Sequence, residues 1–207
     1  DFPRDFGSPF ASMVIAELLG VPQEDRREFR EKLGNLASEV GNDDGKAVIN
    51  PLDYRLDKFT RYIEERRRAP CGDILSDLAT AAYPDGSEPP VLEAVHVASL
   101  LFGAGQDTTA IFLGNALAIL AGDKALQGRL RADPSLIPDF IEEVLRHSGP
   151  VKASCRLARR PVTVAGVAVD PGATVMLSTA AVNRDPKRFD DPAAFRLGRK
   201  GVKEHLS

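Results

Sequence analysis

The interpretation of this chain depends on one stretch, VHVASLLFGAGQDTTAIFL, which occupies residues 95–113. Apolar residues flank its centre on both sides and continue to Ala121. The centre carries residues that a buried helix normally avoids. Two glycines cost about 1 kcal/mol each relative to alanine, and the Asp and Thr side chains that follow compete for backbone hydrogen bonds. A long apolar segment that breaks local rules at its centre indicates a functional site there.

Three structures are compatible with this stretch. A transmembrane span has the required length, but Asp107 lies in its middle, where an ionisable residue is costly. A phosphate-binding loop would use Gly103 and Gly105, but Thr108 occupies the third glycine position and no clean strand precedes it. The third structure is a long central helix that is deformed at residues 104–109 and holds a small ligand there. We favour this third structure.

The composition is that of an ordinary globular protein. The 207 residues carry a net charge of −3, with 43% hydrophobic and 28% charged residues. A nucleic-acid-binding protein would show a basic face, so no nucleic acid is expected as a partner. The N-terminus does not have the pattern of a signal peptide. Cys71 and Cys155 lack C-x-x-C spacing, which indicates free thiols in a reducing compartment. We therefore expect a cytoplasmic protein with no membrane partner.

Helical patterns dominate the chain before Pro150. Apart from the central stretch, helices are expected at residues 9–19, 24–40, 52–68, 73–78, 124–131 and 138–147. After Pro150 the chain becomes rich in β-branched residues, and Gly166 and the dipeptide Pro171-Gly172 mark turns. This change predicts a short antiparallel sheet. The expected fold class is therefore mainly α with a small antiparallel β region.

The hexapeptide AGQDTT at residues 104–109 resembles the oxygen-binding helix motif, A-G-x-(D/E)-T-T, of the cytochromes P-450, the heme-thiolate monooxygenases. Other segments resemble the same family, in the family's order and with its spacing. They are VIAELLGVPQEDR at 14–26, DILSDL at 73–78, NRDP at 183–186 and the F-x-D-P-x-x-F-x-x-x-R pattern at 189–199. The chain is therefore identified as a member of this family, of the bacterial soluble type.

Two further sets of residues gain a role from the resemblance. Glu143 and Arg146 are three residues apart on an expected helix and so share one face. The residues alone indicate an exposed ion pair worth a few tenths of a kcal/mol. The resemblance implies instead the buried E-x-x-R pair of the family, completed by Arg199. It also implies that Arg156 contacts a heme propionate, whereas the residues alone favour a surface arginine, since Arg159 and Arg160 lie beside it.

The resemblance stops at both ends of the chain. The last residues, EHLS, look like the start of the family's heme-ligand loop, whose cysteine would follow Ser207. The family's N-terminal third is absent, and neither Cys71 nor Cys155 lies in a motif that could replace the iron ligand. We therefore expect residues 1–207 to be one partial cytochrome P-450 domain that supplies no metal ligand and is inactive by itself.

For the full-length parent, the resemblance implies a monooxygenase that inserts one oxygen atom from O2 into a lipophilic small molecule. Its cofactor would be heme b, and its electrons would come from a ferredoxin or a flavoprotein reductase. Ala104 and Gly105 would allow close approach to the heme, Thr108 would hydrogen-bond dioxygen, and Asp107 would help to relay protons. Two alternatives stay open: a heme-free homologue that binds and activates a partner enzyme, and an inactive fragment.

Overall fold

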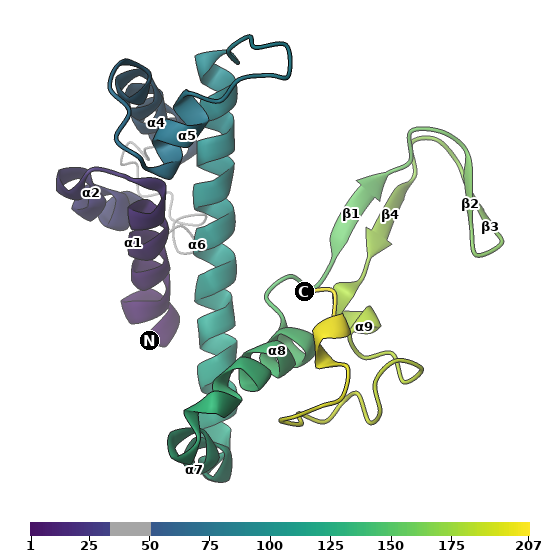
Figure 1. Ribbon diagram of the computed structural model, residues 1–207. Helices are drawn as coiled ribbons and strands as arrows, with labels where there is room; N and C mark the ends of the chain where they lie inside the picture. Colours follow the sequence, from purple (N-terminus) through teal and green to yellow (C-terminus); the bar gives the residue numbers. More distant parts are fainter. Residues whose placement is uncertain (34–50) are drawn as a thin grey trace, which may run out of the picture. The chain divides into compact units, whose positions relative to one another are not determined.

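The computed structural model describes residues 1–33 and 51–207 (Figure 1). These residues form two compact units, Asp1–Ile111 and Phe112–Ser207. Helices account for most of the described chain, and all described strands belong to the second unit. The expected fold class, mainly α with a small antiparallel β region, is confirmed. Part of the helix expected at residues 24–40 lies outside the described residues.

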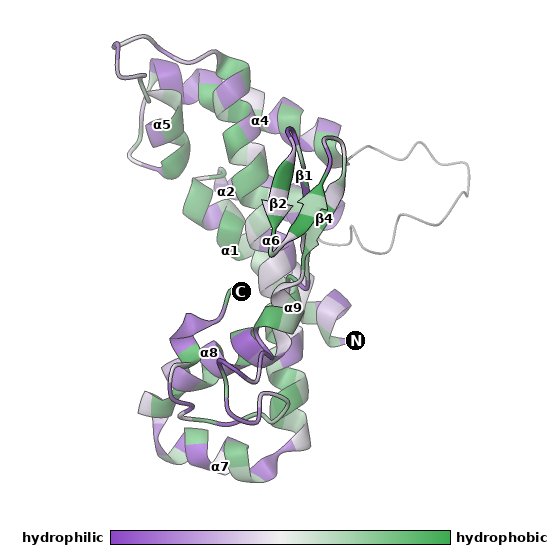
Figure 2. Cartoon of the chain, turned by 90° about the vertical axis from the view of Figure 1, so that its right-hand side faces the viewer, coloured by the Kyte–Doolittle hydropathy of each residue, from purple (hydrophilic) through white to green (hydrophobic). Residues whose placement is uncertain are grey.

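The first unit is built from helices. They are η1 (Pro3–Gly7, π-helical), α1 (Ser8–Leu19), α2 (Gln23–Leu33), α4 (Pro51–Arg68), α5 (Ile74–Ala79) and the first part of α6 (Val91–Gly122). Figure 2 shows hydrophilic and hydrophobic residues mixed around α4, as expected for a helix with one buried face.

A compact polar junction ties the ends of these helices together. Gly20 ends α1 with a φ of 93°, a left-handed conformation that favours glycine. Asp73 begins α5, and its Oδ1 accepts the backbone N–H of Ser76 at 2.7 Å. The other oxygen of Asp73 accepts two hydrogen bonds from Arg66 on α4, at 2.8 and 2.9 Å. Arg66 also donates to the carbonyl of Gly20 at 3.1 Å, so one guanidinium joins three segments.

The central helix α6 is α-helical from Val91 to Gly122 without interruption. The expected deformation at residues 104–109 is therefore absent, and that expectation was wrong. The hydroxyl of Thr108 donates to the carbonyl of Ala104 at 2.6 Å, one turn back, so it is bonded along the helix. Fully buried apolar side chains such as Val95 and Phe102 hold the helix against its neighbours. Their burial offsets the cost of about 1 kcal/mol for each glycine.

No single helix in the described part of the chain is long and apolar enough to cross a membrane. Among the described helices, one pair, α6 and α7 (Lys124–Ala132), meets the criteria of length and composition when taken together, and the two axes are bent by 106°.

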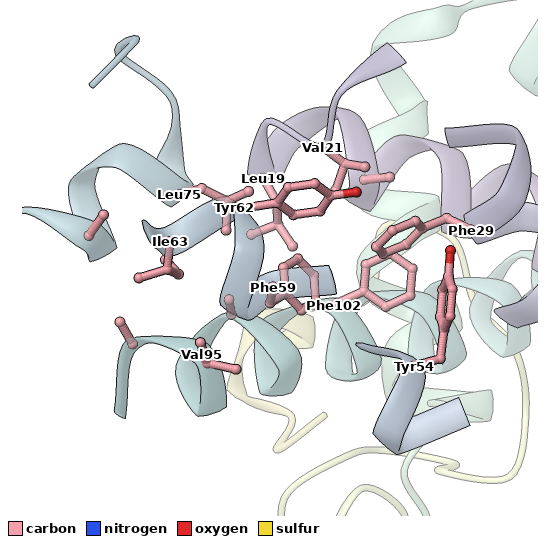
Figure 3. Packing of buried hydrophobic residues seen from close by; sticks show 14 residues of the cluster. Leu19, Val21, Phe29, Tyr54, Phe59, Tyr62, Ile63, Leu75, Val95 and Phe102 are labelled. Atoms are coloured by element: carbon pink, nitrogen blue, oxygen red, sulfur yellow. The ribbon is translucent and has the colours of Figure 1, made fainter. Parts of the chain in front are cut away.

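An aromatic cluster forms the centre of the first unit's core (Figure 3). We define it as Phe29, Tyr54, Phe59, Tyr62 and Phe102, which come from α2, α4 and α6. The ring of Phe29 lies between the other four, with centroid distances of 5.3–6.3 Å. Most of these contacts are edge-to-face, a geometry that adds to the stabilisation from burial alone.

The second unit combines short helices and strands. Its elements after α6 are α7, η2 (Pro134–Leu136), α8 (Ile137–Ser148), β1 (Ser154–Leu157), β2 (Val162–Val164), β3 (Val167–Val169), β4 (Thr174–Leu177), α9 (Thr179–Val182) and η3 (Val202–Glu204). Asp123 caps α7 by accepting the N–H of Leu126 at 2.8 Å. A small core packs Leu126 against Phe140 and Val144 of α8.

The β region contains two sheets among the described residues, where the sequence predicted one. Strand β1 pairs antiparallel with β4, and β2 pairs antiparallel with β3 (Figure 1). The turn between β2 and β3 has positive φ at both Ala165 and Gly166, as a tight two-residue hairpin turn requires. The β1 ladder ends at a bend before Pro161, which has no N–H to donate, and this separates the two sheets.

Candidate functional site

The AGQDTT motif lies in the first unit, on the exposed side of α6. Ala104 and Asp107 are exposed, Thr108 is half-buried, and Gln106 is buried. Residues three and four apart share one face of a helix, so Ala104, Asp107 and Thr108 form one continuous surface. This surface presents a methyl group, a carboxylate and a hydroxyl side by side.

The glycine at position 105 has a packing role that the sequence analysis missed. A Cβ on Gly105 would lie 2.9 Å from Cδ1 of Ile15 on α1, closer than carbon atoms approach without a shift. Glycine therefore lets α1 pack closely against α6. A side chain at position 105 would project toward α1. Only the backbone of Gly105 is therefore left to approach a cofactor, as its expected role requires.

A pocket of about 400 Å³ opens directly beside the motif, entirely within the first unit. It is lined by Leu52, Arg55, Leu56, His96, Ser99, Leu100, Gly103 and Ala104. The residues from α6 recur at helical spacing, so they form one face that ends at the first residue of the motif. The volume is in the range of small-molecule sites in proteins.

Arg55 is the charged group of this pocket. Its Nε is buried and has no hydrogen-bond partner among the described residues. Burial lowers the pKa of the guanidinium, and the carboxylate of Asp107 acts in the opposite direction. Its Nη1 lies 2.7 Å from the position that a Cβ on Gly103 would occupy. Glycine at position 103 therefore leaves room for the guanidinium against the helix.

Arg55 is not among the site residues predicted above, although the sequence contains a signal for it. Leu52, Arg55, Leu56 and Phe59 follow the spacing of an apolar stripe on α4. A charged residue at a stripe position indicates either a long side chain whose charged end reaches solvent or a charge with a local use.

The second unit holds the ion-pair cluster of Glu143, Arg146 and Arg199. The side chains of Glu143 and Arg146 are 0% exposed, and that of Arg199 is 4% exposed. Arg146 donates hydrogen bonds to both carboxylate oxygens of Glu143, from Nε to Oε2 at 2.7 Å and from Nη2 to Oε1 at 2.8 Å. The Nε of Arg199 lies 3.1 Å from each of these oxygens. The geometry is that of a buried network, not of the exposed pair suggested by the residues alone.

Backbone carbonyls accept the remaining donors of the cluster. Arg146 Nη1 donates to the carbonyls of Asn183 and Pro192, each at 2.9 Å. Arg199 Nη2 donates to the carbonyl of Ala194 at 2.7 Å. Burial acts to raise the pKa of Glu143, but hydrogen bonds from both guanidinium groups and a backbone N–H outweigh it and lower that pKa. The cluster thus fastens α8 to the irregular segment that follows α9.

Arg156 is exposed on β1, opposite Val175 of β4. Its Nη1 donates to the carbonyl of its neighbour Cys155 at 2.9 Å, which leaves most of the guanidinium accessible. Cys155 and Cys71 are both exposed free thiols. Within the described ranges, no group of three or more His, Cys, Asp or Glu residues is arranged to hold a metal ion.

A family model for cytochrome P450 matches residues 40–200 of the sequence. The chain belongs to the cytochrome P450 family. It is 35% identical over 204 residues to cytochrome P450 144 of Mycobacterium tuberculosis, covering 94% of this chain and 45% of that protein. The vitamin D(3) 25-hydroxylase of Pseudonocardia autotrophica is 35% identical over 200 residues, covering 96% of this chain and 49% of the hydroxylase.

The fold is also that of a cytochrome P450. The substrate-free structure of cytochrome P450 CYP150A6 from Mycobacterium marinum superposes with a TM-score of 0.88 at 48% identity. That match covers 100% of this chain and 47% of the other. The chain therefore spans about half the length of the curated relatives and of the solved structure that it matches.

Cytochromes P450 bind heme b, and each unit has residues that fit this group. In the first unit, the exposed methyl group of Ala104 on α6 adjoins the apolar side chain of Leu100, which is 70% exposed. A flat apolar ring system could cover such a surface. In the second unit, the accessible guanidinium of Arg156 matches the carboxylate of a propionate.

Proposed function

We propose that the intact protein is a heme-dependent monooxygenase that inserts one oxygen atom from O2 into a lipophilic small molecule. The observation that carries this proposal is that the exposed Asp107 and the half-buried Thr108 share one face of α6 with Ala104, which lines the pocket. Leu52, Leu56, Leu100 and Ala104 give this pocket apolar surface, which suits the apolar part of a substrate. The hydroxylase named in the comparison acts, by its name, on vitamin D(3).

The heme, when bound, supplies the oxygen chemistry, and the protein supplies binding, orientation and protons. Ala104, the backbone of Gly105 and the guanidinium of Arg156 are the residues proposed to hold it. The carboxylate of Asp107 is exposed on α6 and is the group proposed to relay protons. The hydroxyl of Thr108, one position along the helix, holds a proton that it now shares with the carbonyl of Ala104. Turning this hydroxyl outward gives a proton donor toward the oxygen substrate.

The electrons required for this reaction are proposed to come from a ferredoxin or a flavoprotein reductase. The exposed free thiols of Cys71 and Cys155 agree with the proposed cytoplasmic location, where thiols stay reduced.

The carbon-monoxide difference spectrum of the reduced intact protein tests the proposal directly. A Soret band typical of thiolate-ligated heme is expected. Folded helical protein without any heme signal would contradict the monooxygenase and support the second candidate, a heme-free homologue that activates a partner enzyme. Circular dichroism on the same sample separates this outcome from misfolding.

Replacing Thr108 by alanine is expected to uncouple electron consumption from product formation. Product formed per electron pair should fall about tenfold or more, since positioned proton transfer contributes roughly 10²–10⁴-fold to a rate. Substrate affinity should stay unchanged, because the hydroxyl is bonded along α6 and does not line the pocket. The measurement compares product yield with electron-donor consumption. Thr108→Ser keeps the hydroxyl and should restore coupling, and Thr109→Ala is the control. Unchanged coupling in Thr108→Ala would remove Thr108 from the proposed mechanism.

A further inference from the structure

We propose, on the basis of the function proposed above, that Arg55 makes the pocket selective for substrates that carry a carboxylate at one end of an apolar body. The Nε of Arg55 is buried without a hydrogen-bond partner among the described residues. A buried donor left unpaired is costly, and native structures contain few of them. A ligand acceptor at this point would remove that cost.

The neighbours of Arg55 in the pocket do not supply the missing acceptor. Asp107 is the carboxylate that acts on Arg55 electrostatically, yet no ion pair or hydrogen bond joins the two. His96 and Ser99 line the same pocket, and neither accepts a hydrogen bond from Nε of Arg55. The positive charge of Arg55 is permanent, because arginine stays protonated in proteins. A ligand in the pocket would therefore meet a cation at any pH near neutral.

The space around the guanidinium is kept open by a glycine. A Cβ at position 103 would lie 2.7 Å from Nη1 of Arg55, so alanine there would push the guanidinium away from α6. The guanidinium consequently lies along the pocket wall next to Gly103, one residue before the exposed Ala104 of the AGQDTT motif.

The rest of the lining defines the other part of the ligand. Leu52, Leu56 and Leu100 provide apolar surface around the single cation. This combination matches a ligand with a hydrocarbon body and one anionic end, because leucines favour the body and a guanidinium binds a carboxylate through two parallel hydrogen bonds. Since Ala104 lines the same pocket, the apolar body would reach the motif that we propose as the reaction site.

Equilibrium dialysis of the intact protein with decanoate and with 1-decanol at pH 7.5 tests this inference. The two probes share a hydrocarbon chain and differ in charge. Decanoate is expected to bind about 10–100 times more tightly than 1-decanol, the range for a charge-assisted hydrogen bond in a buried site. Equal affinities for the two probes would overturn the inference without any variant.

Variants then locate the selectivity. In Arg55→Met, the ratio of the two affinities should fall to about one, whereas Arg68→Met, an exposed position on the same helix, should keep the wild-type ratio. Gly103→Ala, which leaves every charge in place, should lower the ratio by displacing the guanidinium. A wild-type ratio in folded Arg55→Met or, should that variant not fold, in Gly103→Ala would overturn the assignment.

Dialysis needs no electron donor and no turnover, so its result is separate from that of the spectrum described above. An acid preference in protein that lacks the thiolate-heme band would refute the monooxygenase and keep the selectivity of the pocket. The thiolate-heme band in protein without an acid preference would support the monooxygenase and refute the carboxylate selectivity of the pocket.

Discussion

Replacing Glu143 by glutamine is expected to lower the free energy of unfolding of the intact protein by about 3–5 kcal/mol, the cost of breaking a buried ion pair. Glu143 is the only carboxylate in the described cluster, and two guanidinium groups depend on it. Glutamine has nearly the same shape but no charge. Its NH2 group would also face guanidinium donors, so at least one hydrogen bond would become a contact between two donors.

The measurement is a urea titration of both proteins, in which the midpoint shifts while the slope stays the same. Glu204→Gln is the matched control, because Glu204 pairs with Arg188 at 2.6 Å on the surface, with side chains 47% and 60% exposed. Exposed pairs contribute about 0–1 kcal/mol, so this variant should behave nearly as wild type. Similar losses in both variants would show that the buried geometry has no special energetic weight.

The difference in the free energy of unfolding between wild type and Glu143→Gln is expected to depend on pH. The folded pKa of Glu143 is lowered, so its contribution is fully present above the ordinary carboxyl value of 4.5. It is lost as the pH falls through the lowered folded pKa, since protonation then removes the charge in the native state. The difference between wild type and Glu143→Gln should therefore be constant near neutral pH and shrink in acid. A constant difference down to acid pH would contradict the assigned direction of the shift.

Only part of the geometry of this cluster can be predicted from the local sequence. The spacing of Glu143 and Arg146 predicts that they share a helix face, but it says nothing about burial. Burial is decided by carbonyls and by Arg199, which lie about 40–55 residues further along the chain. Without the family resemblance, local physics favours an exposed pair, because a buried one requires partners that no local pattern reveals.

For the central helix, the local sequence predicted a feature that the structure lacks. Two glycines, an acid and two threonines predicted a deformation, yet α6 is continuous. Local preferences of about 1 kcal/mol per residue are small compared with the packing of a long apolar helix. The packing between Gly105 and Ile15 could not be predicted either, since it depends on how closely α1 approaches. The helices at 9–19, 52–68, 124–131 and 138–147 were located within a few residues, because periodicity and capping residues mark them locally.

Replacing Phe29 by alanine should lower the free energy of unfolding by about 3–5 kcal/mol, the range for removing a buried aromatic ring. Phe29 is 0% exposed, and its ring contacts the four other rings of the aromatic cluster. Those rings come from α4 and α6, so a void at Phe29 removes contacts from three helices at once (Figure 3). Because neighbouring aromatic rings are rigid and mutually packed, they are poorly able to close the void.

Phe29→Leu separates the loss of the buried apolar side chain from the effect of the size of the void. Leucine keeps an apolar side chain but leaves a smaller void, so its cost should be about 1–2 kcal/mol, between the costs of a tolerated exchange and of a full truncation. Urea titrations of the three proteins at one pH give the order wild type, leucine, alanine. If alanine costs no more than leucine, the helices must collapse onto the void. The cluster would then be adaptable, and the position of Phe102 beside Gly103 would no longer fix the wall of the pocket that contains Arg55.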